Sequence, residues 1–153
     1  MVQELKIRIT NIPKVESKLK QLGATFVQEK TFIDTYTNQP AGQVLKIADE
    51  DGNYFIYEYR KNDGKFDEVN KETVSDYEKT KKQLIEKYGL KGVLQGKRRI
   101  YAFQGYKFVL NHIDEVGDFL IITGENPTAD IVTSLGKTPL EYIRVSFDEL
   151  TKQ

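Results

Sequence analysis

The sequence predicts an α+β protein whose main feature is a large antiparallel sheet, either open or closed into a barrel. Strand-like segments outnumber helical ones, most are joined by short hairpin turns, and the few helical segments are amphipathic. Hairpin-linked strands with helices packed on one side are typical of this fold class. The 153 residues are enough for one domain with its own core, so we expect a single domain over residues 1–153.

The first strand is predicted over residues 2–9, VQELKIRI, which alternate in polarity. Leu5, Ile7 and Ile9 form an apolar side. The other side carries Glu4, Lys6 and Arg8. A sheet with one face in water gives this pattern, and so does a strand whose charged side lines a site. The alternation alone leaves both interpretations open.

Residues 11–24 carry apolar side chains at helical spacing and predict an amphipathic helix lying over the sheet. Pro13 suits its first turn, and Gly23 suits its end. Residues 25–36 are rich in β-formers and alternate, which predicts a second strand.

Two hairpins are predicted in the middle of the chain. Asp51-Gly52 marks the turn between strands at residues 44–48 and 54–60, and another Asp-Gly turn precedes a strand at 66–74. Alternation along that last strand puts Phe66, Glu68, Asn70, Glu72 and Val74 on one side.

The second half of the chain begins with a helix and returns to strands. Residues 75–90 predict a helix capped by Ser75 or Asp76. Its apolar residues, which we expect to face the core, are Tyr77, Leu84, Ile85 and Tyr88. The later predicted elements are strands at 97–103, 107–113 and 118–123, a short helix around 127–136 and a tail at 138–150.

The composition excludes several classes of protein. Lys+Arg and Asp+Glu balance at 23 each, so no overall field favours nucleic acid or an anionic membrane. The absence of cysteine excludes disulfides, thiol catalysis and cysteine-ligated zinc. Apolar runs are too short for a membrane span, and no secretion signal is present, so we expect a cytoplasmic protein without a membrane partner.

Motifs of common enzymes are absent, because the chain has no glycine-rich phosphate loop, no G-x-S-x-G and no histidine pair. His112 is the single histidine, and we expect a structural or exposed role for it. Basic residues recur on several predicted strands, where they would form an anion site if the strands brought them into one concavity. Strand faces that are simply exposed to solvent give the same pattern, so the sequence leaves open whether these basic residues form an anion site or only face water.

Short motifs follow one another in a characteristic order over nearly the whole chain. They are Glu4-Leu5-Lys6, Leu22-Gly23-Ala24, Asp34-Thr35-Tyr36, Leu45-Lys46-Ile47, Asp51-Gly52, Ser75-Asp76, Lys97-Arg98-Arg99, Gly117-Asp118-Phe119 and Ser146-Phe147-Asp148-Glu149-Leu150. No single motif is specific, but their order resembles the CYTH superfamily of triphosphate tunnel proteins, in particular its class IV adenylyl cyclase-like branch.

The resemblance implies a barrel-like antiparallel tunnel of about eight strands with a few flanking amphipathic helices. In that family, inward Lys and Arg side chains bind a triphosphate such as ATP, and inward carboxylates bind Mg²⁺ or Mn²⁺. Carried over by position, the phosphate-binding residues are Lys6, Arg8, Lys46, Arg60, Lys97 and Arg99. The metal ligands are Glu4, Glu72 and Glu125, and Glu4 and Lys6 are also the catalytic candidates.

Several acidic positions of the family pattern are replaced here. Val2, Asn111 and Ile121 stand where the family has carboxylates, and His112 stands beside Asn111 in place of another. Loss of carboxylates weakens metal binding and so weakens catalysis of phosphoryl transfer. Asn111 would still offer a neutral ligand, and His112 would suit a softer metal.

Three hypotheses follow. The first is an adenylyl cyclase, which converts ATP to cyclic AMP and pyrophosphate, or a triphosphatase, in either case with a divalent metal. The second is a catalytically impaired module of the same fold that binds a phosphorylated ligand. The third is that the basic strand faces are simply solvated and another surface carries the function. The aromatic-rich strands also leave room for a homodimer.

Overall fold

Eight strands form one closed antiparallel barrel in the computed structural model, which describes residues 2–127 and 142–152. The strand order around the barrel is β1-β5-β4-β3-β2-β6-β7-β8. The strands are β1 (Val2–Ile9), β2 (Thr25–Thr37), β3 (Gln43–Glu50), β4 (Asn53–Asn62), β5 (Lys65–Thr73), β6 (Leu90–Phe103), β7 (Tyr106–Ile113) and β8 (Gly117–Glu125). The helices are α1 (Ile12–Gln21), α2 (Tyr77–Tyr88) and the 3-10 helix η1 (Phe147–Lys152). The predicted α+β class is confirmed, and the sheet is closed rather than open.

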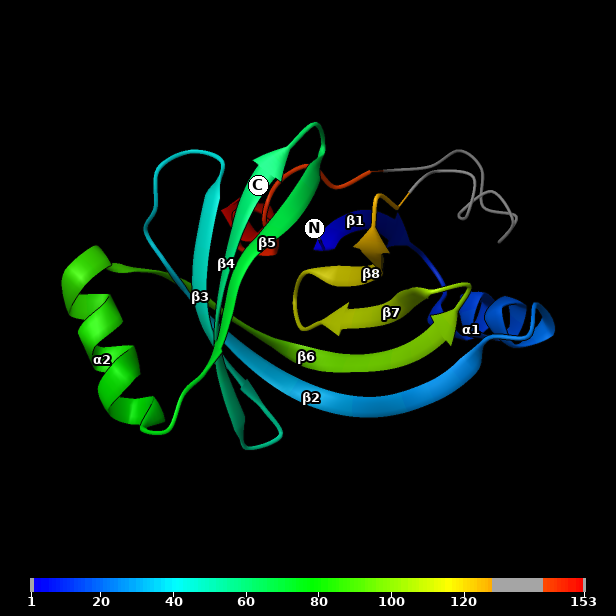
Figure 1. Ribbon diagram of the computed structural model, residues 1–153, viewed down its shortest axis with the longest axis horizontal. Helices are drawn as coiled ribbons and strands as arrows, with labels where there is room; N and C mark the ends of the chain where they lie inside the picture. The colour runs from blue at the N-terminus through cyan, green and yellow to red at the C-terminus, as the bar shows by residue number, and fades with distance from the viewer. Residues whose placement is uncertain (1, 128–141, 153) are drawn as a thin grey trace.

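Two long strands hold the barrel together. Figure 1 shows β2 and β6 curving side by side along the molecule, from the part that contains β3, β4, β5 and α2 to the part that contains β1, β7, β8 and α1. They have 13 and 14 residues. Their curvature brings side chains from both parts into one interior.

The larger apolar core lies outside the barrel, beneath α1. Leu5, Ile7 and Ile9 of β1 pack there against Leu19 of α1. The Asn11 side chain caps this helix by accepting a hydrogen bond from the backbone N–H of Lys14 at 3.0 Å. Because neighbouring residues of a strand point to opposite sides, burial of the apolar side of β1 turns its charged side into the barrel.

A second apolar cluster fills part of the barrel interior. Its members are Phe32, Tyr36, Leu94, Ile113, Phe119, Ile121, Ile143 and Phe147. Two of them, Ile143 and Phe147, come from the end of the chain, so the C-terminal segment completes the interior. The backbone N–H of Ile143 donates to the carbonyl of Lys6 at 2.9 Å, which fixes the segment to β1.

Three details differ from the prediction. β6 begins at Leu90, not at residue 97, so the predicted link after the second helix is strand. No residue of α2 is fully buried, and the side of this helix that was predicted to face the core is half-buried on the outer surface of the barrel. There the ring of Tyr77 stacks on that of Tyr54, with 4.6 Å between the ring centres. The predicted short helix around 127–136 and the first part of the predicted tail lie outside the described residues. Within residues 2–127 and 142–152, no helix is long and apolar enough to cross a membrane.

Candidate functional site

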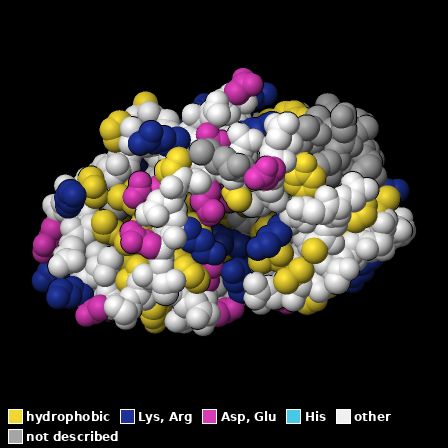
Figure 2. Space-filling view, viewed as in Figure 1, with side chains coloured by type: hydrophobic (Ala, Val, Ile, Leu, Met, Phe, Trp, Pro, Cys, Tyr) yellow, Lys and Arg dark blue, Asp and Glu magenta, His cyan; other side chains and the backbone are white. Residues whose placement is uncertain are grey.

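Three buried or nearly buried cations from three strands line one cavity inside the barrel. They are Lys6 from β1, Lys46 from β3 and Arg98 from β6, and the cavity has a volume of about 30 Å³. Glu4, Tyr36, Tyr59, Ser146 and Phe147 are among its other lining residues. In Figure 2, Lys and Arg side chains gather in a hollow in the middle of the visible face, with Asp and Glu side chains at its border.

Lys6 occupies an unusual environment for a cation. It is only 5% exposed, and its Nζ lies 4.1 Å from the ring centre of Phe66 and 4.2 Å from that of Phe147. Burial lowers the pKa of Lys6 from 10.5 to about 8, although the nearby Glu4 carboxylate opposes this change. Lys6 therefore stays charged at neutral pH, but its buried charge lowers the stability of the folded protein.

Lys46 and Arg98 belong to a network of charges. The Oδ2 atom of Asp34 accepts hydrogen bonds from Lys46 at 2.8 Å and from Arg98 at 3.1 Å. Glu50 accepts from Arg98 and from Lys30, both at 3.0 Å. Three cations against two carboxylates leave this network with an excess positive charge. Burial favours the neutral form of Glu50, but Arg98 and Lys30 outweigh it and hold the pKa of Glu50 below its usual value.

Glu4 and Glu68 are two further carboxylates on the inner side of the barrel, and Asp148 of the C-terminal segment is buried as well. Burial raises the pKa of Glu68, and the negative charge of the nearby Glu4 raises it further. Asp34 and Glu50 are already bound to cations, so they are poor metal ligands as they stand. Across the described ranges, no group of three or more His, Cys, Asp or Glu side chains is arranged to hold a metal ion. Two carboxylates with phosphate oxygens still form a usual Mg²⁺ site, so Glu4 and Glu68 suit a metal that arrives with its ligand.

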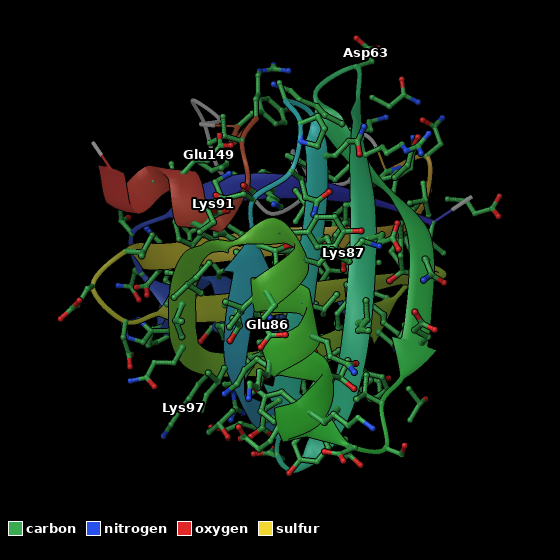
Figure 3. The ribbon with its side chains drawn as sticks, turned by 90° about the vertical axis from the view of Figure 1, so that its left-hand side faces the viewer. Asp63, Glu86, Lys87, Lys91, Lys97 and Glu149 are labelled. Atoms are coloured by element: carbon green, nitrogen blue, oxygen red, sulfur yellow. The ribbon has the colours of Figure 1, made fainter. Side chains whose placement is uncertain are left out.

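The structure does not bring all the predicted phosphate-binding residues together. Arg8 lies on the inward side of β1, with its guanidinium 5.0 Å from the ring centre of Phe119. Arg60 is exposed on the outer side of β4. Lys97 points away from the barrel into solvent (Figure 3). Only Lys6, Lys46 and Arg8, of the six predicted positions, therefore lie on the inner side.

Arg99 lies on the outer side of β6. It pairs with Glu16 of α1, and its Nη1 lies 2.7 Å from Glu29 of β2. The same Glu16 also accepts a hydrogen bond from the Tyr101 hydroxyl at 2.6 Å. Arg99 thus ties α1 to the barrel wall, and its neighbour Arg98 occupies the inward position.

The two other predicted metal ligands are both exposed, but Glu72 lies on the opposite side of the sheet from Glu4, whereas Glu125 lies on the same side as Glu4, two residues beyond its partner Thr123. The pairing of β4 with β5 contains a bulge between Glu58 and Tyr59, which reverses the inward and outward alternation of β5. Glu72 therefore pairs with Ile56 on the outer side and is exposed. Glu125 is exposed at the end of β8, opposite Val2. His112 is also exposed, and its Nδ1 lies 2.6 Å from Asp118.

The sequence prediction missed Arg98, Asp34, Glu50 and Glu68. Asp34 and Arg98 belong to two of the short motifs on which the family resemblance rests. Their place in these motifs could have identified them as site residues. The chain end was also missed. Lys91 holds η1 against the barrel through Asp148 at 3.2 Å and Glu149 at 3.1 Å, and Figure 3 shows Lys91 and Glu149 side by side.

Comparisons with known proteins agree with this architecture. The family model of the CYTH domain matches residues 1–149. The Methanocaldococcus jannaschii protein named "Putative adenylate cyclase MJ0240" is 32% identical over 128 residues, which cover 76% of this chain and 73% of that protein.

Solved structures are similar over almost the whole chain. PH1012 of Pyrococcus horikoshii is 26% identical, with a TM-score of 0.86 and coverage of 98% of this chain and 99% of that chain. HpAC1 of Hippeastrum, described as an adenylyl cyclase candidate with a dominant triphosphatase activity, is 15% identical, with a TM-score of 0.67 and coverage of 99% and 95%. At that identity the likeness to HpAC1 shows the fold alone.

Proposed function

The chain belongs to the CYTH domain family, and on that premise we propose that it binds the triphosphate group of a small molecule inside the barrel. The observation that carries the proposal is the convergence of Lys6, Lys46 and Arg98 on one cavity. Ammonium and guanidinium groups form short, strong hydrogen bonds with phosphate oxygens, and these bonds strengthen where water is excluded.

Each of the three cations has a distinct part in this proposal. Lys6 lies against the rings of Phe66 and Phe147 and is stabilised at longer range by carboxylates, first among them Glu4. A phosphate would add a close anionic partner to this buried ammonium group. Lys46 and Arg98 would turn toward the ligand while Asp34 holds them in place. Arg8 lies on the same side of β1 and could meet a longer ligand.

The C-terminal segment has to yield before such a ligand fits. A cavity of about 30 Å³ has room for only about two water molecules. Phe147 and Ser146 line this cavity, and Phe147 covers Lys6. We infer that binding displaces Phe147 from Lys6 and exchanges a cation–π contact for an ion pair.

Metal-dependent turnover is the second candidate function, and the proximity of Glu4 to Glu68 favours it. These two carboxylates would hold Mg²⁺ or Mn²⁺ together with phosphate oxygens, and the ion would neutralise charge that develops during phosphoryl transfer. Either of the family reactions, cyclisation of ATP or hydrolysis of a triphosphate, would use such a site. The names of MJ0240 and HpAC1 refer to these two activities in those proteins.

Calorimetric titration of tripolyphosphate and of ATP tests the proposal. We would titrate each ligand with Mg²⁺, with Mn²⁺ and with a chelator, and assay the same samples for phosphate and cyclic AMP. Lys6→Ala should weaken binding about 10-fold or more, whereas Lys82→Ala, which removes an exposed cation of α2, should change it less than about 2-fold. Equal effects of the two substitutions, or no binding by the unaltered protein, would refute binding in the barrel. Binding without product would leave a binding module, and product that requires metal would establish an enzyme.

A further inference from the structure

Asn111 is a buried amide whose polar atoms have no partner among the described residues. It is 1% exposed, and neither its side-chain oxygen nor its nitrogen forms a hydrogen bond there. Its alternate neighbours on β7, Val109 and Ile113, pack within the barrel, while Leu110 packs on the outside beneath α1. The side chain of Asn111 therefore faces the barrel interior.

An unpaired amide in this position is costly to the folded protein. Asn111 pairs in register with Phe119 on one side and with Arg98 on the other, and Phe119 is fully buried. A buried polar group that lacks a hydrogen bond loses its water without compensation. A leucine of similar shape would fill the same space without that loss. The buried amide thus points to a hydrogen-bonding role that the described residues alone do not fulfil.

Two further buried atoms without a partner belong to Arg98, the register neighbour of Asn111, and to Asp34, which binds Arg98. Arg98 binds Asp34 and Glu50 through its two Nη atoms, but its Nε has no partner among the described residues. The Oδ1 atom of Asp34 is likewise without one, because both cations bind Oδ2. Arg98 Nε–H is a donor, Asp34 Oδ1 is an acceptor, and Asn111 supplies both.

This combination suits a neutral group better than a phosphate. Phosphate oxygens at neutral pH mainly accept hydrogen bonds, so they would repel the oxygens of Asp34 and Asn111. The two Nη atoms of Arg98 already bind carboxylates, so its Nε–H is the donor that remains for such a group. A group that both donates and accepts, such as a ribose hydroxyl or the amide edge of a base, would satisfy all three residues.

We propose that Asn111, with Arg98 and Asp34, recognises the organic part of the ligand through a group that both donates and accepts hydrogen bonds. This inference rests on the proposed function, since Lys6 and Lys46 would hold the phosphates of the same molecule. Arg98 lines the cation-lined cavity and is the register partner of Asn111, so it connects the two regions. Asn111 is then a specificity-determining residue.

A comparison of ATP with tripolyphosphate tests this assignment, because only ATP carries the organic part. Affinities would be measured by calorimetry for the unaltered protein, for Asn111→Leu and for His112→Leu, which changes the exposed neighbour on the outer side. We expect Asn111→Leu to weaken ATP binding about 10-fold, which corresponds to about 1.4 kcal/mol, and to change tripolyphosphate binding less than about 2-fold. His112→Leu should change neither affinity.

The other outcomes overturn the assignment. Equal losses for both ligands would place Asn111 at the phosphates, and no loss for ATP would leave it without a role in binding. Binding of tripolyphosphate but not of ATP would refute recognition of the organic part of ATP while keeping the proposed function. If neither ligand binds, the proposed function fails and this inference fails with it. Thermal unfolding of each variant monitors the fold, and Asn111→Thr, a smaller neutral change suited to a strand, provides the same comparison if the leucine does not fit.

Discussion

Replacement of Lys6 by methionine should make the protein more stable and less able to bind phosphates. Methionine keeps an unbranched chain between Phe66 and Phe147 but carries no charge. Burial lowers the pKa of Lys6 from 10.5 to about 8. One pKa unit corresponds to about 1.4 kcal/mol, so holding the ammonium inside the barrel costs about 3 kcal/mol at pH 7.

The pH dependence gives this prediction a clear sign. Below pH 8 the lysine is charged in both the folded and unfolded protein, and the cost is fully present. Between pH 8 and 10.5 the unfolded chain binds more protons at Lys6 than the folded one, so the stability of the unaltered protein rises with pH. The advantage of Lys6→Met should therefore fall from about 3 kcal/mol at pH 7 to about 1 kcal/mol at pH 10.

Urea unfolding at pH 7 and pH 10 measures this difference, and thermal unfolding at pH 7 should show a rise of about 6–12 °C. Tripolyphosphate titration of the same variant should show a loss of affinity of about 10-fold or more. A variant that is no more stable at pH 7, or whose advantage is the same at both pH values, would refute the reasoning about the buried charge.

Three further predictions concern the walls of the barrel. Arg98→Lys should weaken ATP binding about 10-fold, because lysine cannot keep both the Asp34 and the Glu50 contacts and still offer an Nε–H, whereas Arg99→Lys on the outer side should change it less than about 2-fold; the two titrations give opposite results if the register of β6 is shifted by one residue. Gly96→Ala should lower the free energy of unfolding by about 1–3 kcal/mol, since a Cβ there would lie 1.9 Å from the backbone oxygen of His112, and unchanged urea unfolding would contradict that close approach. Glu16→Gln should cost about 1 kcal/mol or less, because the side chain of its partner Arg99 is still 33% exposed and water screens the pair, and a larger loss in the same assay would mean that α1 depends on this pair.

The strand pattern predicted the fold well because alternation and hairpin turns are local signals. The inward side of β1 could also be inferred once Leu5, Ile7 and Ile9 were assigned to one core. β6 was harder, since both of its sides are buried near Arg98 and Arg99: Ile100 and Tyr101 are each less than 10% exposed. Alternation does not distinguish the sides of such a strand, and the prediction assigned Lys97 and Arg99 to the phosphates although Arg98 is the residue that lies inside.

The acidic positions show a second limit of sequence patterns. Glu72 shares the parity of Phe66 only if the strand is regular, and the bulge opposite Glu58 removes that regularity. The residue types of β5 do not predict the bulge, because it arises from the pairing between two strands. The contribution of Phe147 was equally hidden, since contact between the chain end and Lys6 depends on how the barrel closes.

Closure of the barrel pairs the first strand, β1, with the last, β8. β1 and β8 pair along a ladder that runs from Val2 opposite Glu125 to Ile9 opposite Asp118, whereas β1 meets β5 at Gln3 and Glu4. β1 is therefore synthesised well before its main partner β8, and contacts so distant in sequence are slow to form. Until then Lys6 stays hydrated, and the cost of removing its water falls on the last step of folding. The charge that prepares the interior for an anion also makes that interior the final part of the protein to form.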